Sequence, residues 1–227
     1  MNAVRPDYSQ LYVLGDPFSN RYMRLTVQRD ARYIEADYDA FEGLVRAVFR
    51  GDPWTKPPLK LTHLKGGQPA DFVWTDYPPI TVISQRMVDL FSEHRFTGWT
   101  TYPVEIYDKK GSRLSNYHGL AITGRAGGED YRRGSVIDKP PIVPNGAPFQ
   151  VLRGFYFEND YWDGSDFCIT SGYLPIIVTK RVVKVLTEIK VGNIEFTNLL
   201  EREIDVSSLK IAGVWPPERN TAGTQLH

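Results

Sequence analysis

Hydrophobic and polar positions follow the same pattern in two segments of the chain that lie about 95 positions apart. Each segment begins with an apolar run typical of a strand and then meets a Ser or Thr suited to cap a helix. The apolar residues that follow have helical spacing and would lie on one helix face: Met87, Leu90 and Phe91 in the first segment, and Val182, Val183, Leu186 and Ile189 in the second. A second strand then begins, with residues 104–106 matching residues 194–196. The pattern predicts two similar strand-helix-strand units, at about 80–106 and 176–196.

The rest of the chain predicts strands, turns and one further helix. Two apolar runs near the start, residues 11–14 and 22–27, are separated by turn residues and predict a hairpin. An apolar stripe with helical spacing predicts a helix over about residues 39–50. Residues 54–64 begin rich in proline and then alternate as a half-buried strand would. The glycine- and proline-rich stretch 124–148 reads as a long excursion from the sheet.

These elements indicate an α+β protein. We expect one domain over residues 1–215, in which about three helices pack on a mostly antiparallel or mixed sheet and the two similar units contribute related halves. Residues 216–227 carry a Pro-Pro pair followed by small and polar residues, and they predict a flexible C-terminal tail.

The composition is that of an ordinary globular protein without a long-range electrostatic field. The chain of 227 residues is 41% hydrophobic, and its 27 basic and 27 acidic residues cancel. Because phosphate backbones are attracted mainly by positive charge, we expect no nucleic-acid partner. The first residues lack the basic and apolar regions of a secretory signal, and no apolar run reaches the length of a membrane span. We therefore expect a cytoplasmic protein that does not insert into membranes.

Motifs that normally carry catalysis, metals or cofactors are weak in this chain. The glycine-rich segment 124–128 lacks the Gly-Lys-Ser/Thr ending of a phosphate loop and is followed by two acidic residues. The four histidines are scattered without the spacing of a zinc site. The only cysteine, Cys168, has apolar neighbours in a predicted strand, which is typical of a buried thiol rather than a nucleophile. We expect no metal and no cofactor.

One loop, residues 155–167, combines aromatic and acidic side chains more densely than any other part of the chain. It does not fit a calcium loop. Aligning Gly164 with the obligatory glycine places Tyr161 where an oxygen ligand belongs and Thr170 where the bidentate Glu belongs.

Three roles remain open for this loop. The first is a glycosidase pair in which Glu158 and either Asp163 or Asp166 act as acid and base beside stacking aromatics. The second is a protein-binding surface of rigid aromatics ringed by carboxylates that complement a basic partner. The third is structural, with Trp162 and Phe167 packing and the aspartates making turn hydrogen bonds. The candidate partner-binding residues are Glu158, Asp160, Tyr161, Trp162, Asp163 and Asp166.

Two arginines hold equivalent places in the first turns of the two predicted helices. A positive charge at Arg86 or Arg181 opposes the helix dipole, so a neighbouring carboxylate should compensate it. We expect Glu105 and Glu195, on the following strands, to be the partners.

A series of short motifs carries a family resemblance over roughly residues 59–200. In chain order they are Ala70-Asp71-Phe72, Ile80 to Ser84 with Arg86 and a helix, Tyr117-His118-Gly119-Leu120, Trp162-Asp163-Gly164-Ser165-Asp166-Phe167, Ile177-Val178-Thr179-Lys180-Arg181-Val182, and Gly192-Asn193-Ile194-Glu195-Phe196. This order resembles a bacterial family of polymorphic-toxin immunity proteins first described from myxobacteria, immunity family eleven and its relatives.

The resemblance implies a non-enzymatic α+β protein, encoded beside a secreted or contact-delivered toxin, that binds and neutralises that toxin. It supplies no catalytic residues and no toxin-contacting residues, so the acidic loop is a candidate on its composition alone. A hydrolase or glycan-active enzyme using the carboxylates near Trp162, and a structural or adaptor module, remain the alternatives.

Overall fold

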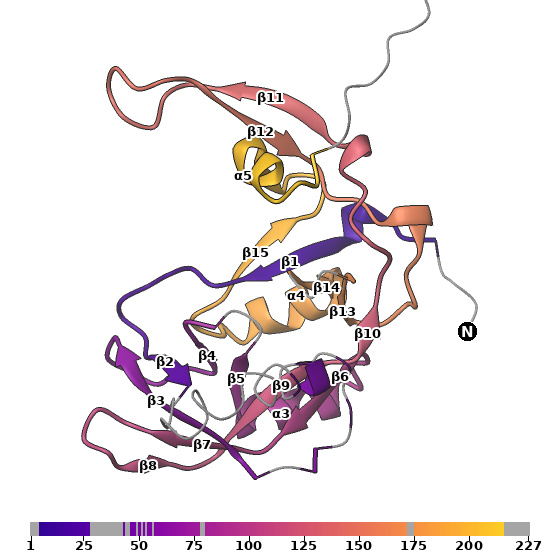
Figure 1. The fold of residues 1–227 in the computed structure, drawn as a ribbon. Helices are drawn as coiled ribbons and strands as arrows, with labels where there is room; N and C mark the ends of the chain where they lie inside the picture. Colours follow the sequence, from indigo (N-terminus) through magenta and orange to yellow (C-terminus); the bar gives the residue numbers. More distant parts are fainter. Residues whose placement is uncertain are drawn as a thin grey trace, which may run out of the picture.

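The fold is built mainly from short strands, with two α-helices of nine residues each (Figure 1). The computed structural model describes residues 5–27, 57–77, 80–171 and 175–215, together with Gly43, Arg46 to Val48, Arg50, Asp52, Trp54 and Thr55. The helices are α3 (Gln85–Glu93), α4 (Lys180–Glu188) and α5 (Val206–Ile211), with 3-10 turns η1 (Tyr8–Gln10), η2 (Tyr131–Arg133) and η3 (Glu158–Asp160). The strands are β1 (Leu11–Gly15), β2 (Arg24–Val27), β3 (Leu59–Lys65), β4 (Phe72–Trp74), β5 (Thr81–Ser84), β6 (Trp99–Tyr102), β7 (Val104–Tyr107), β8 (Arg113–Leu114), β9 (Tyr117–Ile122), β10 (Gly124–Arg125), β11 (Ser135–Lys139), β12 (Phe149–Arg153), β13 (Phe167–Ile169), β14 (Ile176–Thr179), β15 (Glu195–Asn198) and β16 (Glu203–Asp205).

The described strands form four sheets rather than one. Their orders are β10-β13-β14-β1-β15, β4-β5-β9-β6, β2-β3-β7-β8 and β11-β12-β16. Pairing is antiparallel except between β3 and β7 and between β10 and β13. The expected mixture of helices with mostly antiparallel sheets is therefore present.

A strand-helix-strand unit occurs at both predicted places, as β5-α3-β6 and β14-α4-β15. The two strands of a unit are not neighbours in their sheet. Strand β9 lies between β5 and β6 and is antiparallel to both, and β1 lies in the same way between β14 and β15. Strand β4 then pairs with the outer side of β5 as β13 pairs with β14. The two arrangements share one strand order and one set of directions.

The correspondence between the units extends to single residues. Helix α4 begins and ends 95 positions after α3. Each helix is followed by a non-glycine residue in the left-handed conformation, Arg95 (φ 52°) and Lys190 (φ 54°). The backbone N–H groups of these residues donate to the carbonyls of Ser92 and Thr187, which also lie 95 positions apart. The repetition seen in the sequence is thus repeated in the backbone.

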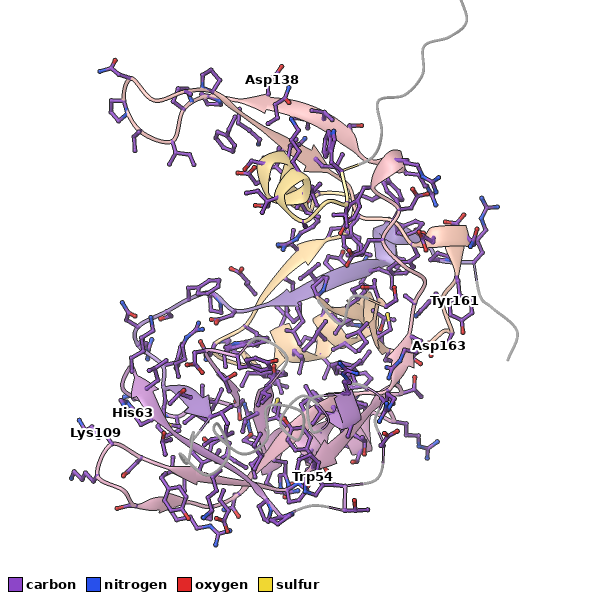
Figure 2. All side chains as sticks on the ribbon, viewed as in Figure 1. Trp54, His63, Lys109, Asp138, Tyr161 and Asp163 are labelled. Atoms are coloured by element: carbon purple, nitrogen blue, oxygen red, sulfur yellow. The ribbon has the colours of Figure 1, made fainter. Side chains whose placement is uncertain are left out.

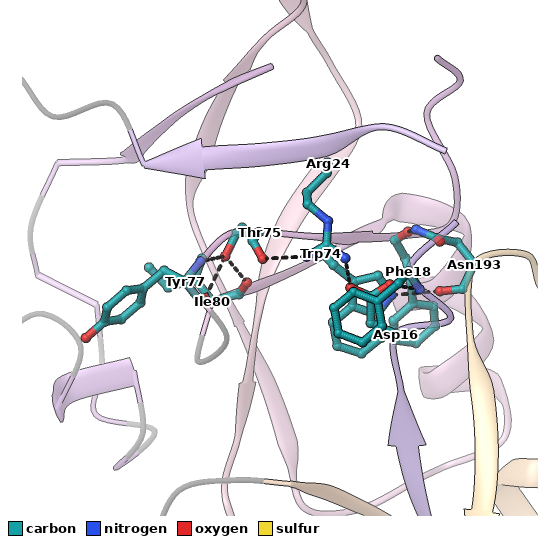
Figure 3. Close-up of polar contacts among 9 residues, drawn as sticks. Asp16, Phe18, Arg24, Trp74, Thr75, Tyr77, Ile80 and Asn193 are labelled. Atoms are coloured by element: carbon teal, nitrogen blue, oxygen red, sulfur yellow. Dashed lines mark hydrogen bonds and ion pairs between the residues drawn. The ribbon is translucent and has the colours of Figure 1, made fainter. Parts of the chain in front are cut away.

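The two units share one hydrophobic core. Buried residues of both helices and both sheets form a single cluster, in which the ring centroids of Phe91 on α3 and Phe167 on β13 lie 4.9 Å apart. Polar contacts also cross between the units (Figure 3). The Trp74 indole donates to the Asn193 carbonyl at 2.7 Å, and the Asn193 amide donates to the Phe72 carbonyl at 2.8 Å. Because Asn193 is buried, these bonds fix the end of the second unit on the sheet of the first.

Other elements cover the outer faces of the two sheets. In the sheet of the first unit, β4-β5-β9-β6, the face that carries Val73 and Val82 is covered by residues of β2, β3 and β7. In the sheet of the second unit, β10-β13-β14-β1-β15, the face that carries Ile177 is covered by Phe155, Phe157 and Leu199. Figure 1 shows the β11–β12 hairpin with α5 at one end of the molecule, and β3, β7 and β8 at the other.

Two predictions about the strands are wrong. Strands β1 and β2 do not form a hairpin, because β1 is buried on both faces and pairs with β14 and β15, while β2 pairs with β3. The second strand of the first unit is β6, not residues 104–106. Pro103, which cannot donate a backbone hydrogen bond, ends β6, and the chain continues as β7 in a different sheet.

The number of helices differs from the three expected, because α5 was not predicted and accompanies the two nine-residue helices and the helical residues within 43–50. Within the range predicted as a helix at 39–50, the described residues Gly43, Arg46 to Val48 and Arg50 are helical, and the others lie outside the described residues. The predicted tail, 216–227, lies outside them as well.

Substitution of Gly98 tests how closely the two units pack against each other. Its φ is +82°, and a Cβ there would overlap the Phe167 carbonyl oxygen of the other sheet. Gly111 has φ +78° but no atom within 4 Å of a built Cβ. Both Gly→Ala variants should lose about 1–2 kcal/mol through left-handed backbone strain. Gly98→Ala should lose about 2 kcal/mol more, because the overlap forces the sheets apart. Urea unfolding of both variants measures the difference, and equal losses would contradict close packing at Gly98.

Candidate functional site

The acidic aromatic loop follows β12 and lies along residues 124–130, which include the glycine-rich segment 124–128. Bridges join Ala126 to Trp162 and Glu129 to Phe157. The Gly127 N–H donates to the Tyr161 carbonyl at 2.8 Å, and the Glu158 N–H donates to the Gly128 carbonyl at 2.7 Å. The glycine-rich segment therefore acts as a backbone partner of the loop, and these bonds hold the loop in place. Figure 2 shows Tyr161 and Asp163 on one side of the molecule.

Asp163 holds a turn together. Its carboxylate accepts hydrogen bonds from the Arg125 N–H at 2.7 Å and the Ser165 N–H at 2.9 Å. In addition, the Asp163 N–H donates to the Arg125 carbonyl at 3.1 Å. Asp163 thus has the turn-forming role that the structural reading predicts for this residue.

Asp166 is a buried structural residue, with 8% of its surface exposed. Its carboxylate accepts from the Thr97 N–H at 3.1 Å, the Thr179 hydroxyl at 3.0 Å and the Arg181 guanidinium at 2.9 Å. These donors come from the loop after α3 and from the start of α4. Asp166 therefore joins the two units and compensates the positive charge in the first turn of α4.

The corresponding residue in the first unit is Asp71, 95 positions earlier. It accepts a hydrogen bond from the Ser84 hydroxyl at 2.8 Å and forms an ion pair with Arg86. Burial works against ionisation of Asp71, but the hydrogen bonds from Arg86 and Ser84 outweigh it and hold the pKa of Asp71 below its usual value.

The two helix arginines therefore do reach carboxylates, but the predicted partners are wrong. The strand that carries Glu105 belongs to another sheet, and Glu105 lies 3.5 Å from Arg113. Asp71 and Asp166 instead sit immediately before β4 and β13, the strands that pair beside the start of each helix. The sequence contains the repeated Asp-Phe pair that marks these positions, but local spacing does not show which strand lies beside the helix.

Trp162 is half-buried and packs on the cluster formed by residues such as Phe157 and Cys168. Its indole N–H donates to the Ser165 carbonyl at 3.2 Å. Trp162 thus has packing contacts in addition to any part in binding, so its removal should cost stability.

Asp160 belongs to a compact cluster that sequence reasoning missed. It accepts a hydrogen bond from the Tyr8 hydroxyl at 2.7 Å and forms an ion pair with Arg133. The Arg133 guanidinium lies 4.4 Å from the ring centroid of Tyr156 and 5.2 Å from that of Tyr8. The sequence shows Arg133 only as half of a basic pair, and Tyr8 lies far away along the chain, so no local signal connects them.

The Asp160 cluster shifts the titration of its members. The hydrogen bond from Arg133, together with that from Tyr8, holds the pKa of Asp160 below its usual value. Burial, together with the neighbouring Asp160, raises the pKa of Tyr8 to about 12.

Asn159 and Asp160 both have positive φ, at 55° and 50°. The ion pair therefore helps to hold a backbone conformation that non-glycine residues rarely adopt.

Two of the six candidate residues remain exposed. Glu158 is exposed, and Tyr161 has 41% of its surface exposed. Both lie in or beside η3, whose backbone is fixed by the hydrogen bonds to Gly127 and Gly128. The loop thus presents an aromatic ring and a carboxylate from a fixed backbone.

Other chemistry has little support within the described part of the chain. No group of three or more His, Cys, Asp or Glu residues there could hold a metal ion. Cys168 is buried, and burial together with the nearby Asp163 raises the pKa of its thiol, so it is poorly suited to act as a nucleophile. No helix among the described residues is long and apolar enough to cross a membrane.

No protein-family model matches the chain, and no curated protein matches it significantly.

The contacts of the buried Asp166 predict that its removal destabilises the folded protein. Asp166→Ala leaves the Thr97 N–H, the Thr179 hydroxyl and Arg181 without their shared acceptor, and it should lower the free energy of unfolding by about 2–3 kcal/mol. The exposed residue Asp138 accepts one amide hydrogen bond from Gln150, so Asp138→Ala should change stability by less than about 0.5 kcal/mol. Urea unfolding compares the two, and a stable Asp166→Ala protein would leave this carboxylate free for another role.

The Asp160 ion pair predicts a pH-dependent contribution to stability. Because the folded pKa of Asp160 is depressed, its contribution is complete above the unfolded pKa of about 4 and is lost as the pH falls through the folded value. Asp160→Asn should therefore be less stable than wild type at pH 7, by up to about 1 kcal/mol for this partly exposed pair. The gap should close below pH 4. Thermal unfolding across this pH range measures it, and a gap independent of pH would rule out ionisation as its cause.

Proposed function

We propose that this protein is a non-enzymatic immunity protein that binds a cognate bacterial toxin and neutralises it. The observation that carries the proposal is that the acidic loop combines structural carboxylates with exposed side chains on one fixed backbone. Asp163 and Asp166 accept structural hydrogen bonds, whereas Glu158 and Tyr161 face solvent from the same fixed loop. A surface whose backbone is already fixed by hydrogen bonds favours binding, because little conformational entropy is lost when a partner docks.

The chemistry of such a protein is recognition. A standard interface of about 1,600 Å², with a few aromatic anchors, is sufficient for nanomolar binding. Tyr161 offers a rigid amphipathic ring of the kind that anchors interfaces. Glu158 would attract the basic cleft of a toxin that acts on nucleic acid and raise the rate of association.

The glycosidase alternative loses support from the same contacts. That mechanism needs Glu158 paired with Asp163 or Asp166, with one carboxyl group donating a proton and the other facing the sugar. Asp166 is buried among three donors, and Asp163 accepts two backbone N–H groups. Neither carboxylate is directed at a substrate, so binding fits the loop better than hydrolysis.

The test is rescue and binding with the protein encoded immediately upstream. Co-expression of wild-type chain should relieve growth arrest by that protein, and isothermal titration should give tight binding with the purified pair. Tyr161→Ala should weaken binding by about 2 kcal/mol without changing the melting temperature, because the ring is exposed.

Trp162→Ala is the matched comparison within the same loop. It removes packing as well as surface, so it should also lower the melting temperature. Full binding by Tyr161→Ala would remove the loop from the interface, and growth arrest unrelieved by wild type would remove the proposed function.

A further inference from the structure

A projecting hairpin carries the clearest unassigned surface of the molecule. Strands β11 and β12 extend away from the body, and the turn between them spans residues 140–148 (Figure 1). Ile142 and Val143 stand at this tip with 84% and 60% of their surfaces exposed. These two side chains are adjacent in the chain and form an exposed apolar patch, a feature that marks interaction sites on protein surfaces.

The backbone of the tip is restricted in shape although most of its residues are exposed. Four prolines, at positions 140, 141, 144 and 148, restrict its backbone. The Gly146 N–H donates to the Val143 carbonyl at 3.0 Å, and Asn145 takes the left-handed conformation at φ 62°. A restricted turn presents its side chains to a partner at low entropic cost.

The base of the hairpin is anchored firmly. Glu203 on β16 lies 2.9 Å from Lys139 on β11 and 2.6 Å from Arg153 on β12. Leu152 is buried against Val206 and Leu209 of α5. The body therefore holds the hairpin in a fixed direction while its tip remains free.

We propose that the hairpin tip is a plug that inserts Ile142 and Val143 into an apolar cleft on the toxin. This inference rests on the proposed function and adds a second contact to the loop around Tyr161. A convex tip is complementary to a concave surface, which would enclose both side chains and reach the flanking strands. Desolvated apolar anchors at the centre of an interface are where binding energy concentrates.

Other occupants fit the tip less well. Two tips meeting in a dimer would contact through one short turn each, below the roughly 20–30 residues a side of a stable interface. A membrane surface favours basic residues together with Trp or Phe, whereas residues 140–148 contain no charged and no aromatic residue. A cleft in a protein partner is the remaining complement to a small, neutral and apolar projection.

The experiment is isothermal titration of the purified upstream-encoded protein with three variants. The double variant Ile142→Ser with Val143→Ser should keep the wild-type melting temperature and raise the dissociation constant about thirtyfold or more. Ile142→Leu should retain most of the affinity, because the tip stays apolar. Ile211→Ser is the matched control, because Ile211 is 87% exposed but lies on α5, and it should bind like wild type.

The outcomes separate this inference from the proposed function. Wild-type affinity in the double variant, with binding by wild type intact, overturns the plug and leaves the function standing. Absence of binding by wild type overturns both. Sedimentation that shows wild type to be dimeric and the double variant monomeric, or wild-type binding to anionic vesicles that the double variant loses, would assign the tip to another partner and overturn the plug.

Discussion

Each strand-helix-strand unit of this protein leaves a gap in its own sheet that a distant strand must fill. The nine-residue helix of each unit connects two strands that are not neighbours in the sheet. One strand position therefore separates β5 from β6, and one separates β14 from β15. The place between β5 and β6 is filled by β9, and the place between β14 and β15 is filled by β1, from the start of the chain. Unpaired backbone groups inside a buried sheet are costly, so neither unit is complete by itself. The sheet of the second unit therefore cannot close until β1 meets β14 and β15, more than 150 residues later in the sequence.

The shared core follows from the same constraint. Once both sheets are closed, each presents an apolar face with a helix, and the two faces bury each other in one cluster. Asn193 and Gly98 occupy equivalent positions, each after its helix. Asn193 lies against β4 and Gly98 against β13, and these two strands correspond to each other in the opposite sheets. Asp166 adds a polar connection between the units at the start of α4. Packing and hydrogen bonding thus reinforce a single arrangement of the units, which favours one native state over alternatives.

Local pattern predicted what depends on local physics. Apolar spacing was sufficient to place both helices, because a helix face is set by the spacing of residues within a few turns. The expected capping by Ser84 and Thr179 is wrong, because their hydroxyls donate to Asp71 and Asp166 instead of accepting backbone N–H groups of the helices. The partners of β1 and of the helix arginines were missed, because they are set by contacts between residues far apart in the chain. Composition found the acidic loop but could not sort its members. Glu158 and Asp163 look alike in the sequence, yet one faces solvent and the other closes a turn. That difference depends on the Arg125 backbone, which only the fold brings to the loop.

The two units agree where they build the scaffold and differ where the chain leaves it. Between β9 and β13 the chain makes the β11–β12 hairpin, η2 and η3, and these segments carry both the exposed loop residues and the apolar tip. Between β1 and β4, the matching interval, the described residues instead supply β2 and β3, which cover the first sheet. A scaffold of two similar units has little freedom to change, because both units share one core. Segments outside that core can vary without disturbing it, so the interval between β9 and β13 is where a surface specific to one partner would evolve.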